Sequence, residues 1–265
     1  MDETWIATAL AVTAAFETAD DPFAAVTGDF DGEGLSCGAL QWNVGQGTLQ
    51  PLVKRAGEAA VMAHMPIHGA AFWAAMAKPI PETLADVRAW QAEGRLDPAF
   101  AQELAGFLGS PEMRREQRAA ARTIAQKAFA EAERWAASRG ATPSQPEFCW
   151  FFDCVTQNGG LKGLGLADVR AFIAGNPAPE TAICDWLRER APPEFATRDC
   201  RRNAALWRGA TPDQNRDLFV LSYLRALKCA SQSRGAVMNR KGTLATMRGW
   251  VNGRLIDLSP KFLTA

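Results

Sequence analysis

Apolar positions repeat at helical spacing over most of the chain. The first repeat covers residues 3–17, where Ile6 and Leu10 form a stripe that ends at Glu17. The longest covers residues 111–138, which follow a capping serine and carry a proline in the first turn. The remaining helical patterns lie at 48–55, 70–77, 81–92, 98–107, 145–157, 166–174, 179–190 and 212–230. The sequence therefore predicts a mainly α-helical fold.

Two segments lack this period. Residues 18–47 are rich in glycine and contain short alternating runs, which predicts loops and a small irregular sheet. Residues 235–259 also place glycines between short runs, and we expect a hairpin or a loop there. Segment 191–198 is the best linker candidate, but it is too short to require two domains. We therefore expect a single domain over residues 1–265.

Composition excludes two classes of partner. The 29 basic and 29 acidic side chains cancel, so no global field attracts nucleic acid or an anionic membrane surface. No window has the apolar length of a membrane span. The chain begins Met-Asp-Glu, which is acidic where a secretory signal is basic. We expect a protein made in the cytoplasm without a signal peptide, with neither nucleic acid nor a membrane as partner.

The cysteines and histidines do not form a metal motif. Cysteines occur without a CxxC pattern at positions 37, 149, 154, 184, 200 and 229. This spacing favours buried free thiols over a zinc site, although disulfides stay open. His64 and His68 have i, i+4 spacing, but Pro66 between them breaks the helix that such a metal pair would need. We predict no metal and no cofactor.

Two carboxyl groups in contrasting surroundings are the candidate chemistry. Glu17 shares an apolar stripe, so its carboxyl is expected to face the interior or the wall of a cleft. Burial raises the pKa of a carboxyl and can keep it protonated for proton donation. Asp31 lies in a glycine-spaced turn, where we expect it to stay ionised. Hydrolysis of a glycosidic bond needs one such acid and one such base, and the Ser36 hydroxyl could hold the attacking water.

Residue types alone leave other interpretations open. Glu17 can be a surface residue at a helix end, and "TGDFDGEG" can be an ordinary turn or a calcium loop. The calcium interpretation lacks the later bidentate glutamate of an EF-hand.

Two sequence blocks resemble a known family. "FE" at a helix end followed by "GDFDGEGLSCGALQW" resembles the lysozyme superfamily, and within it the chitosanase family, whose helix-end glutamate precedes a "DGRGYTGG" segment. The block "FFDCVTQNGG", residues 151–160, resembles the "FYDAxVxHG" helix end of the same family. The resemblance implies that Glu17 is the general acid, Asp31 the base and Ser36 the water-positioning residue. It also implies a lysozyme-like, two-lobed helical fold, with helix 111–138 between the lobes and a small β element beside the active-site cleft.

The chain departs from the chitosanase pattern in ways that bear on the substrate. Glu33 replaces the family's arginine, and Leu35 and Ser36 replace its Tyr-Thr pair. The interval from Glu17 to Asp31 is shorter, and "GALQW" resembles the "GLMQ" segment of lytic transglycosylases and goose-type lysozymes. The chain also lacks an acidic surplus that would hold cationic chitosan. Peptidoglycan is therefore the expected substrate.

Several polar residues near these blocks are candidates for substrate binding. They are Asp29, Gln41, Trp42, Asn43, Gln157 and Asn158. Trp42 can stack on a sugar ring, although a core tryptophan is the alternative. Asp153, one turn before Gln157, can orient the catalytic segment or satisfy the helix end. For Arg240 and Lys241 the default interpretation is a solvated turn, although they can also contact a carboxylate or acetamido group of the substrate.

Together these features predict a glycoside hydrolase of the muramidase kind. It would cleave β-1,4 bonds of an amino-sugar polymer, with bacterial peptidoglycan expected. We expect it to act in the periplasm or on the cell wall, as an antibacterial effector delivered by a secretion apparatus such as a contractile injection system, or by phage lysis machinery. An immunity protein is a further expected partner. The alternatives are a chitosanase, a lytic transglycosylase that works through Glu17 alone, and a non-catalytic cell-wall-binding module.

Overall fold

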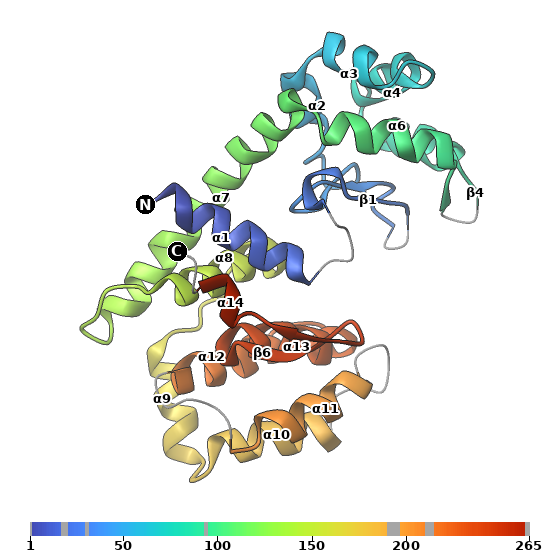
Figure 1. The fold of residues 1–265 in the computed structure, drawn as a ribbon. Helices are drawn as coiled ribbons and strands as arrows, with labels where there is room; N and C mark the ends of the chain where they lie inside the picture. The colour runs from blue at the N-terminus through green and yellow to red at the C-terminus, as the bar shows by residue number, and fades with distance from the viewer. Residues whose placement is uncertain are drawn as a thin grey trace. The chain divides into compact units, whose positions relative to one another are not determined.

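The structure is a computed structural model that describes residues 2–16, 21–29, 32–92, 95–189, 197–209 and 215–262. Over these ranges the protein is mainly helical and contains three small antiparallel sheets (Figure 1). The chain forms two compact units: the sheet unit, Glu17–Thr123, and the α8 unit, Met1–Phe16 with Ile124–Ala265. The boundary falls within the longest helix, α7 (Pro111–Ala137). The mainly helical fold with a small sheet is confirmed, whereas the two-lobed arrangement around a cleft stays a prediction.

The sheet unit combines a three-stranded sheet with short helices. Its elements are η1 (Pro22–Ala24), β1 (Val26–Thr27), β2 (Ser36–Cys37), β3 (Trp42–Asn43), α2 (Gln50–Ala56), α3 (Glu58–His64), α4 (Gly69–Met76), α5 (Ile80–Ala89), β4 (Gln91–Ala92), β5 (Arg95–Leu96), α6 (Pro98–Leu108) and the start of α7. The first three strands pair antiparallel in the order β1-β2-β3. This sheet forms in the glycine-rich segment where a small irregular sheet was predicted.

A buried glutamine on α7 holds the turn between β2 and β3. Gln117 is fully buried, and its Oε1 accepts a hydrogen bond from the Ala39 amide at 3.1 Å. Its Nε2 donates to the carbonyl oxygens of Leu108 at 3.0 Å and Phe23 at 3.1 Å. Gly38 permits this contact, because its φ is +72° and a Cβ atom there would lie 2.3 Å from Gln117 Oε1. One side chain thus joins the sheet, η1 and the end of α6.

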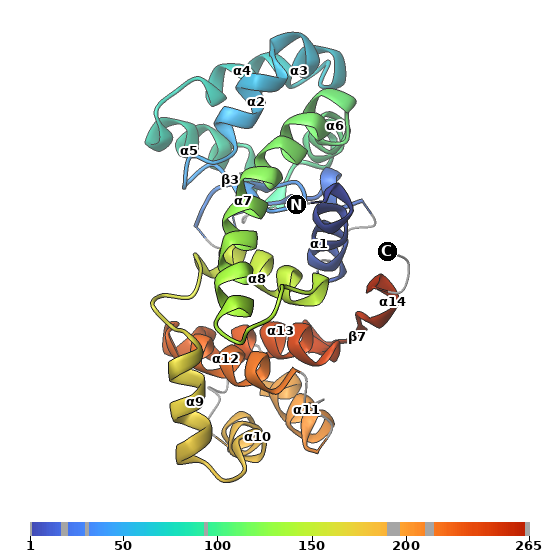
Figure 2. The same cartoon turned by 90° about the vertical axis from the view of Figure 1, so that its left-hand side faces the viewer.

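The α8 unit is built around α8 (Gln145–Asn158), most of whose residues are buried. Its other elements are α1 (Glu3–Ala15), the end of α7, α9 (Leu166–Gly175), α10 (Pro179–Glu189), α11 (Thr197–Trp207), α12 (Arg216–Leu227), η3 (Ser231–Ser233), α13 (Arg234–Thr246), β6 (Arg248–Val251), β7 (Arg254–Asp257) and α14 (Ser259–Phe262). Helix α8 packs against α1 and α13, and α13 packs against α12 (Figure 2). The hairpin of β6 and β7 follows α13 and packs on it.

Most of the helical predictions are confirmed. The stripe of α1 is buried at Ile6 and Leu10, but the helix ends at Ala15 instead of continuing to residue 17 as predicted, and Glu17 itself lies outside the described residues. Helix α7 begins after Ser110, whose Oγ accepts a hydrogen bond from the Met113 amide at 3.2 Å. The predicted helices at 98–107, 145–157, 166–174 and 179–190 correspond to α6, α8, α9 and α10.

The prediction for residues 235–259 is wrong in its first half. Arg234–Thr246 form helix α13, and only the part after it forms the predicted hairpin. The helical period was hidden because α13 buries three polar side chains, Asn239, Lys241 and Thr243. When the buried face of a helix carries polar side chains, the sequence shows no apolar stripe at helical spacing, and the helix cannot be recognised from that pattern.

Three smaller differences from the prediction concern short elements. Helices α3 and α11 were not predicted, and α11 begins at Thr197, inside the proposed linker. The rest of that linker, residues 191–196, lies outside the described residues. The helix predicted at 81–92 is too long at its C-terminal end, because α5 ends at Ala89 and Gln91 already belongs to strand β4. No helix in the described ranges is both long enough and apolar enough to cross a membrane.

The contact between α13 and α11 gives a test of the packing. A Cβ atom on Gly242 would lie 2.5 Å from Cη2 of Trp207, whose ring is held by an Nε1 hydrogen bond to the Arg248 carbonyl at 2.7 Å. Because that rigid ring has no room to move, we expect Gly242→Ala to lower the free energy of unfolding by about 1–3 kcal/mol. Urea unfolding measures it. Gly175→Ala is the matched control on α9, where a Cβ atom meets nothing within 4 Å, and equal destabilisation of both variants would contradict the packing.

Candidate functional site

The two predicted catalytic carboxyl groups, Glu17 and Asp31, lie outside the described residues. The residue before the first of them, Phe16, is fully buried. Ser36 lies in β2 opposite Asn43 of β3, and both side chains are buried. The predicted water-positioning role of Ser36 stays a prediction.

Asp29 is a structural residue of the turn that precedes Asp31. Its Oδ2 accepts a hydrogen bond from Arg88 Nε at 2.7 Å, and its Oδ1 accepts one from the Gly34 amide at 2.8 Å. The hydrogen bond from Arg88 is the main cause that lowers the pKa of the Asp29 carboxyl below its usual value, against a smaller opposing effect of burial. Both oxygens are thus engaged within the sheet unit, where they fix the start of the acidic turn.

The other predicted binding residues of this segment also stabilise the sheet. Gln41 has a φ of +55°, and its Oε1 accepts a hydrogen bond from Thr27 Oγ1 at 3.2 Å. Asn43 Oδ1 accepts one from the Gln46 amide at 2.8 Å. Trp42 is buried at 7% exposure, so its ring is a core residue and offers little surface for a sugar to stack on.

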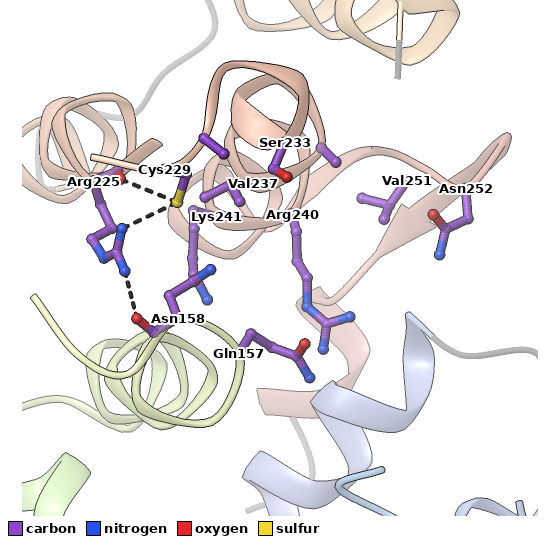
Figure 3. A pocket seen from close by; sticks show the side chains of 12 residues that line it. Gln157, Asn158, Arg225, Cys229, Ser233, Val237, Arg240, Lys241, Val251 and Asn252 are labelled. Atoms are coloured by element: carbon purple, nitrogen blue, oxygen red, sulfur yellow. Dashed lines mark hydrogen bonds between the residues drawn. The ribbon is translucent and has the colours of Figure 1, made fainter. Parts of the chain in front are cut away.

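The α8 unit contains a polar pocket of about 540 Å³ (Figure 3). The described residues that line it are Gln157, Asn158, Arg225, Cys229, Ala230, Ser233, Ala236, Val237, Arg240, Lys241, Val251 and Asn252. Two of them, Gln157 and Asn158, are predicted binding residues at the end of α8. They face basic side chains that come from α12 and α13 (Figure 3). The structure therefore brings the second sequence block to a concave, basic surface.

A buried ionic cluster forms one wall of this pocket. Asp153 on α8 is fully buried, and its Oδ1 lies 2.9 Å from Arg240 Nε and 2.8 Å from Arg240 Nη2. Its Oδ2 contacts Nζ of Lys241, which is only 1% exposed. The alternative of a solvated turn for Arg240 and Lys241 is therefore wrong, because α13 carries both of them into the interior.

The charges of this cluster support one another. Burial raises the pKa of the Asp153 carboxyl, but the nearby Arg240 and Lys241 outweigh it and lower that pKa below 3.8. Burial also lowers the pKa of the Lys241 ammonium, and the Asp153 carboxylate opposes this effect. Asp153 is consequently a structural anion at neutral pH, and it connects α8 to α13.

Arg225 caps the C-terminal end of α8. It was not among the residues predicted from the sequence. Its Nε donates to the Gly160 carbonyl at 2.7 Å, and its Nη2 donates to the Asn158 carbonyl at 2.5 Å. These carbonyls follow the last turn of α8, where the chain turns left-handed at Gly159 (φ +65°). A guanidinium satisfies such orphan carbonyls and suits the negative end of the helix. The available signal was a single arginine in the apolar run "LFVLSYLRAL".

The pocket also reaches the end of α1. The Arg240 guanidinium lies over the ring of Phe16, 4.5 Å from its centroid. Asn252, in the turn between β6 and β7, donates from Nδ2 to the Phe16 carbonyl oxygen at 3.2 Å. Two residues that line the pocket therefore contact the residue to which Glu17 is directly bonded.

The thiols and histidines carry no catalytic arrangement in the described ranges. All six cysteines are free, and only Cys229, at the pocket, is partly exposed. Burial raises the pKa of Cys37, so it is a poor nucleophile. His68 Nδ1 lies 3.0 Å from Glu103, and His64 lies 3.8 Å from Glu112. The described residues contain no cluster of three or more metal-ligating side chains.

Comparison with known proteins adds no family to this geometry. No protein-family model matches the chain, and no curated protein or solved structure matches it at a significant level. The resemblance to the lysozyme superfamily therefore stays a prediction that the two sequence blocks support.

Removal of the buried carboxylate should destabilise the protein. We expect Asp153→Asn to cost about 3–5 kcal/mol at pH 7, because it leaves two buried cations without their anion. The lowered pKa means that this stabilisation is present above pH 3.8 and is lost as the pH falls through the folded-state pKa. Urea unfolding should therefore show a gap between wild type and variant that narrows in acid. Asp86→Asn, which breaks an exposed pair with Lys78, is the control and should cost less than about 1 kcal/mol.

The pocket should be detectable by thiol chemistry. In the native protein we expect iodoacetamide to modify one thiol quickly, that of Cys229, because the other five are buried. Intact-mass measurement over time gives the number of modified thiols, and Cys229→Ala should abolish the fast reaction. Rapid modification of a second cysteine in Cys229→Ala would contradict the burial described above.

Proposed function

We propose that the protein is a lysozyme-like glycoside hydrolase that cleaves β-1,4 bonds in the glycan strand of bacterial peptidoglycan. One observation supports the proposal most: the polar pocket of the α8 unit contacts Phe16, the residue bonded to the predicted acid Glu17. Phe16 of the first sequence block and Gln157 and Asn158 of the second block, residues 151–160, thus lie at this pocket. The two-lobed lysozyme-like arrangement belongs to the same proposal.

In the proposed mechanism, Glu17 protonates the leaving oxygen of the glycosidic bond. Phe16, the residue bonded to it, is fully buried, and we expect Glu17 to have apolar surroundings as well. Apolar surroundings favour the protonated acid, which a proton donor needs at neutral pH. Arg240, which lies over the Phe16 ring, is engaged by the Asp153 carboxylate.

Asp31 acts as the base that removes a proton from the attacking water. Two residues before it, the Asp29 carboxylate accepts hydrogen bonds from Arg88 and from the Gly34 amide. A base that is held in place loses less freedom when a water is positioned. Ser36, in the strand that follows, is the proposed hydrogen-bond partner of that water.

The polar side chains at the pocket suit an amino sugar. Gln157, Asn158 and Asn252 carry amide groups that can both donate and accept hydrogen bonds with hydroxyl and acetamido groups. The pocket contributes no carboxylate among its described lining residues, so it offers nothing to balance the ammonium groups of chitosan. This composition favours peptidoglycan over chitosan as substrate. The proposed site of action is the cell wall, after delivery from the producing cell.

The predicted acid can be tested directly. We expect Glu17→Gln to reduce release of reducing ends from purified peptidoglycan by about 10²–10⁴-fold, because the general acid is removed. Circular dichroism and thermal unfolding should stay at wild-type values. Glu133→Gln, at an exposed position on α7, is the matched control and should leave activity unchanged.

The outcome with Asp31 separates the competing functions. Hydrolysis through Asp31 predicts near-total loss in Asp31→Asn, whereas a lytic transglycosylase would keep substantial activity and release anhydro products. Mass spectrometry of the products distinguishes the two reactions, and a chitosan oligomer tested in parallel identifies a chitosanase. Retention of peptidoglycan without any cleavage would indicate a binding module and contradict the proposal.

A further inference from the structure

Arg225 is a buried cation that has no carboxylate partner among the described residues. The side chain is 2% exposed, yet its contacts are two backbone carbonyls and the Cys229 sulfur, which lies 3.2 Å from Nη1. A guanidinium is always protonated in proteins and carries five N–H donors. Buried charges are normally paired with an opposite charge, since an unpaired one is costly. The end of α8 supplies dipoles to this cation but no counter-charge.

Two acidic side chains of the described ranges lie in this region, and neither forms an ion pair with Arg225. Asp153 contacts Arg240 and Lys241. Glu131 lies beside Gly160, whose carbonyl oxygen accepts a hydrogen bond from Arg225. Arg225 adds a third cation that lines the same pocket. Lys241 also has donors to spare, because an ammonium has three N–H bonds and its hydrogen bond goes to Asp153.

We infer that this pocket binds a carboxylate of the ligand, with Arg225 and Lys241 as the donors. Arg225 comes from α12 and Lys241 from α13, and both side chains lie at the same side of the pocket, opposite the end of α8 (Figure 3). A carboxylate held there supplies the missing negative charge, and planar guanidinium and carboxylate groups pair well. Gln157 and Asn252 line the same pocket and are suited to hold uncharged parts of the same ligand.

The inference rests on the proposed function for the identity of the ligand. An amino-sugar polymer that also carries carboxylates is a peptidoglycan strand, either at a free lactyl group or on its peptide. Neutral chitin lacks this group, and chitosan carries the opposite charge, which buried cations repel. The pocket would thus select among amino-sugar polymers by charge.

The test compares ligands on one protein, the Glu17→Gln variant of residues 1–265, in which the proposed acid is removed so that the ligands are not consumed. Calorimetry would measure the binding of four soluble probes: a disaccharide with a free lactyl carboxylate, a disaccharide-peptide, the same disaccharide-peptide with its carboxylates converted to amides, and a chitosan tetrasaccharide. We expect the carboxylated probes to bind at least about 10-fold more tightly than the amidated one, as a charged hydrogen bond is lost. The first two probes show whether sugar or peptide supplies the carboxylate.

Arg225 itself is tested by substitution. Arg225→Met should abolish the preference for carboxylated over amidated probe, and Arg225→Lys should retain part of it. Lys127→Gln removes a positive charge from an exposed position of α7 and should retain all of it. Arg225→Met also loses the cap of α8, so its folding is checked by circular dichroism. The charge preference is the ratio of two affinities measured on the same variant, and a partial loss of stability that weakens both affinities equally leaves this ratio unchanged.

Protection of Cys229 gives an independent measurement. Its sulfur accepts a hydrogen bond from Arg225, so a carboxylate bound there should slow alkylation of Cys229, and the amidated probe should not. Equal affinity for carboxylated and amidated probes would overturn the inference while leaving glycan cleavage by wild type intact. Selective binding of the carboxylated probe by a wild type that cleaves no glycan would overturn the proposed function and keep the inference.

Discussion

The carboxylate of Asp153, with the two cations that meet it, determines how α13 packs on α8. Three charges withdrawn from water cost several kcal/mol each unless their partners are close, and here both carboxylate oxygens contact a cation. This contact explains how α13 can be a buried helix without an apolar stripe. It also holds Arg240 over Phe16, so the end of α1 depends on the same carboxylate. The wall of the pocket and the residue before the predicted acid therefore share one electrostatic support.

A second constraint is the end of α8. The helix stops at Asn158, the chain turns left-handed at Gly159, and the freed carbonyls are satisfied by Arg225. The cap places a guanidinium at the pocket, where none of the described residues gives it a carboxylate partner. A helix terminus and a binding surface thus use the same side chain. The stability of α8 and the charge of the pocket cannot be changed independently at this position.

Local patterns in the sequence were sufficient for much of the fold. The apolar stripe of α1 and the serine cap of α7 depend on nearby residues, so a single sequence reveals them. Helix α13 was missed because its polar side chains are buried by partners far away in the chain. Lys241 and Asp153 are an example, since the ion pair between them joins helices that no local period connects.

The candidate site divides in the same way. The block that ends in Gln157 and Asn158 was identified from its resemblance, and both residues line the pocket. Arg225 was not identified, because an arginine in an apolar helix has several ordinary interpretations. Only the structure shows that this side chain is buried and that none of the described carboxylates contacts it. Asp29, Gln41 and Asn43 were identified as binding residues, yet their polar atoms serve the turns of the sheet.

This division bears on where specificity can arise. In the segment that carries the predicted catalytic carboxyl groups, the described polar side chains are largely occupied with holding their own backbone. Contacts available to a ligand are found instead in the α8 unit, on Gln157, Asn252 and the basic side chains of α12 and α13. Under the proposed function, the catalytic carboxyl groups and the polar side chains of the pocket are encoded far apart in the chain. Asp153 nevertheless links the two, because it sets the charge of the pocket at Lys241 and holds Arg240 over Phe16, so a change at Asp153 is expected to affect both.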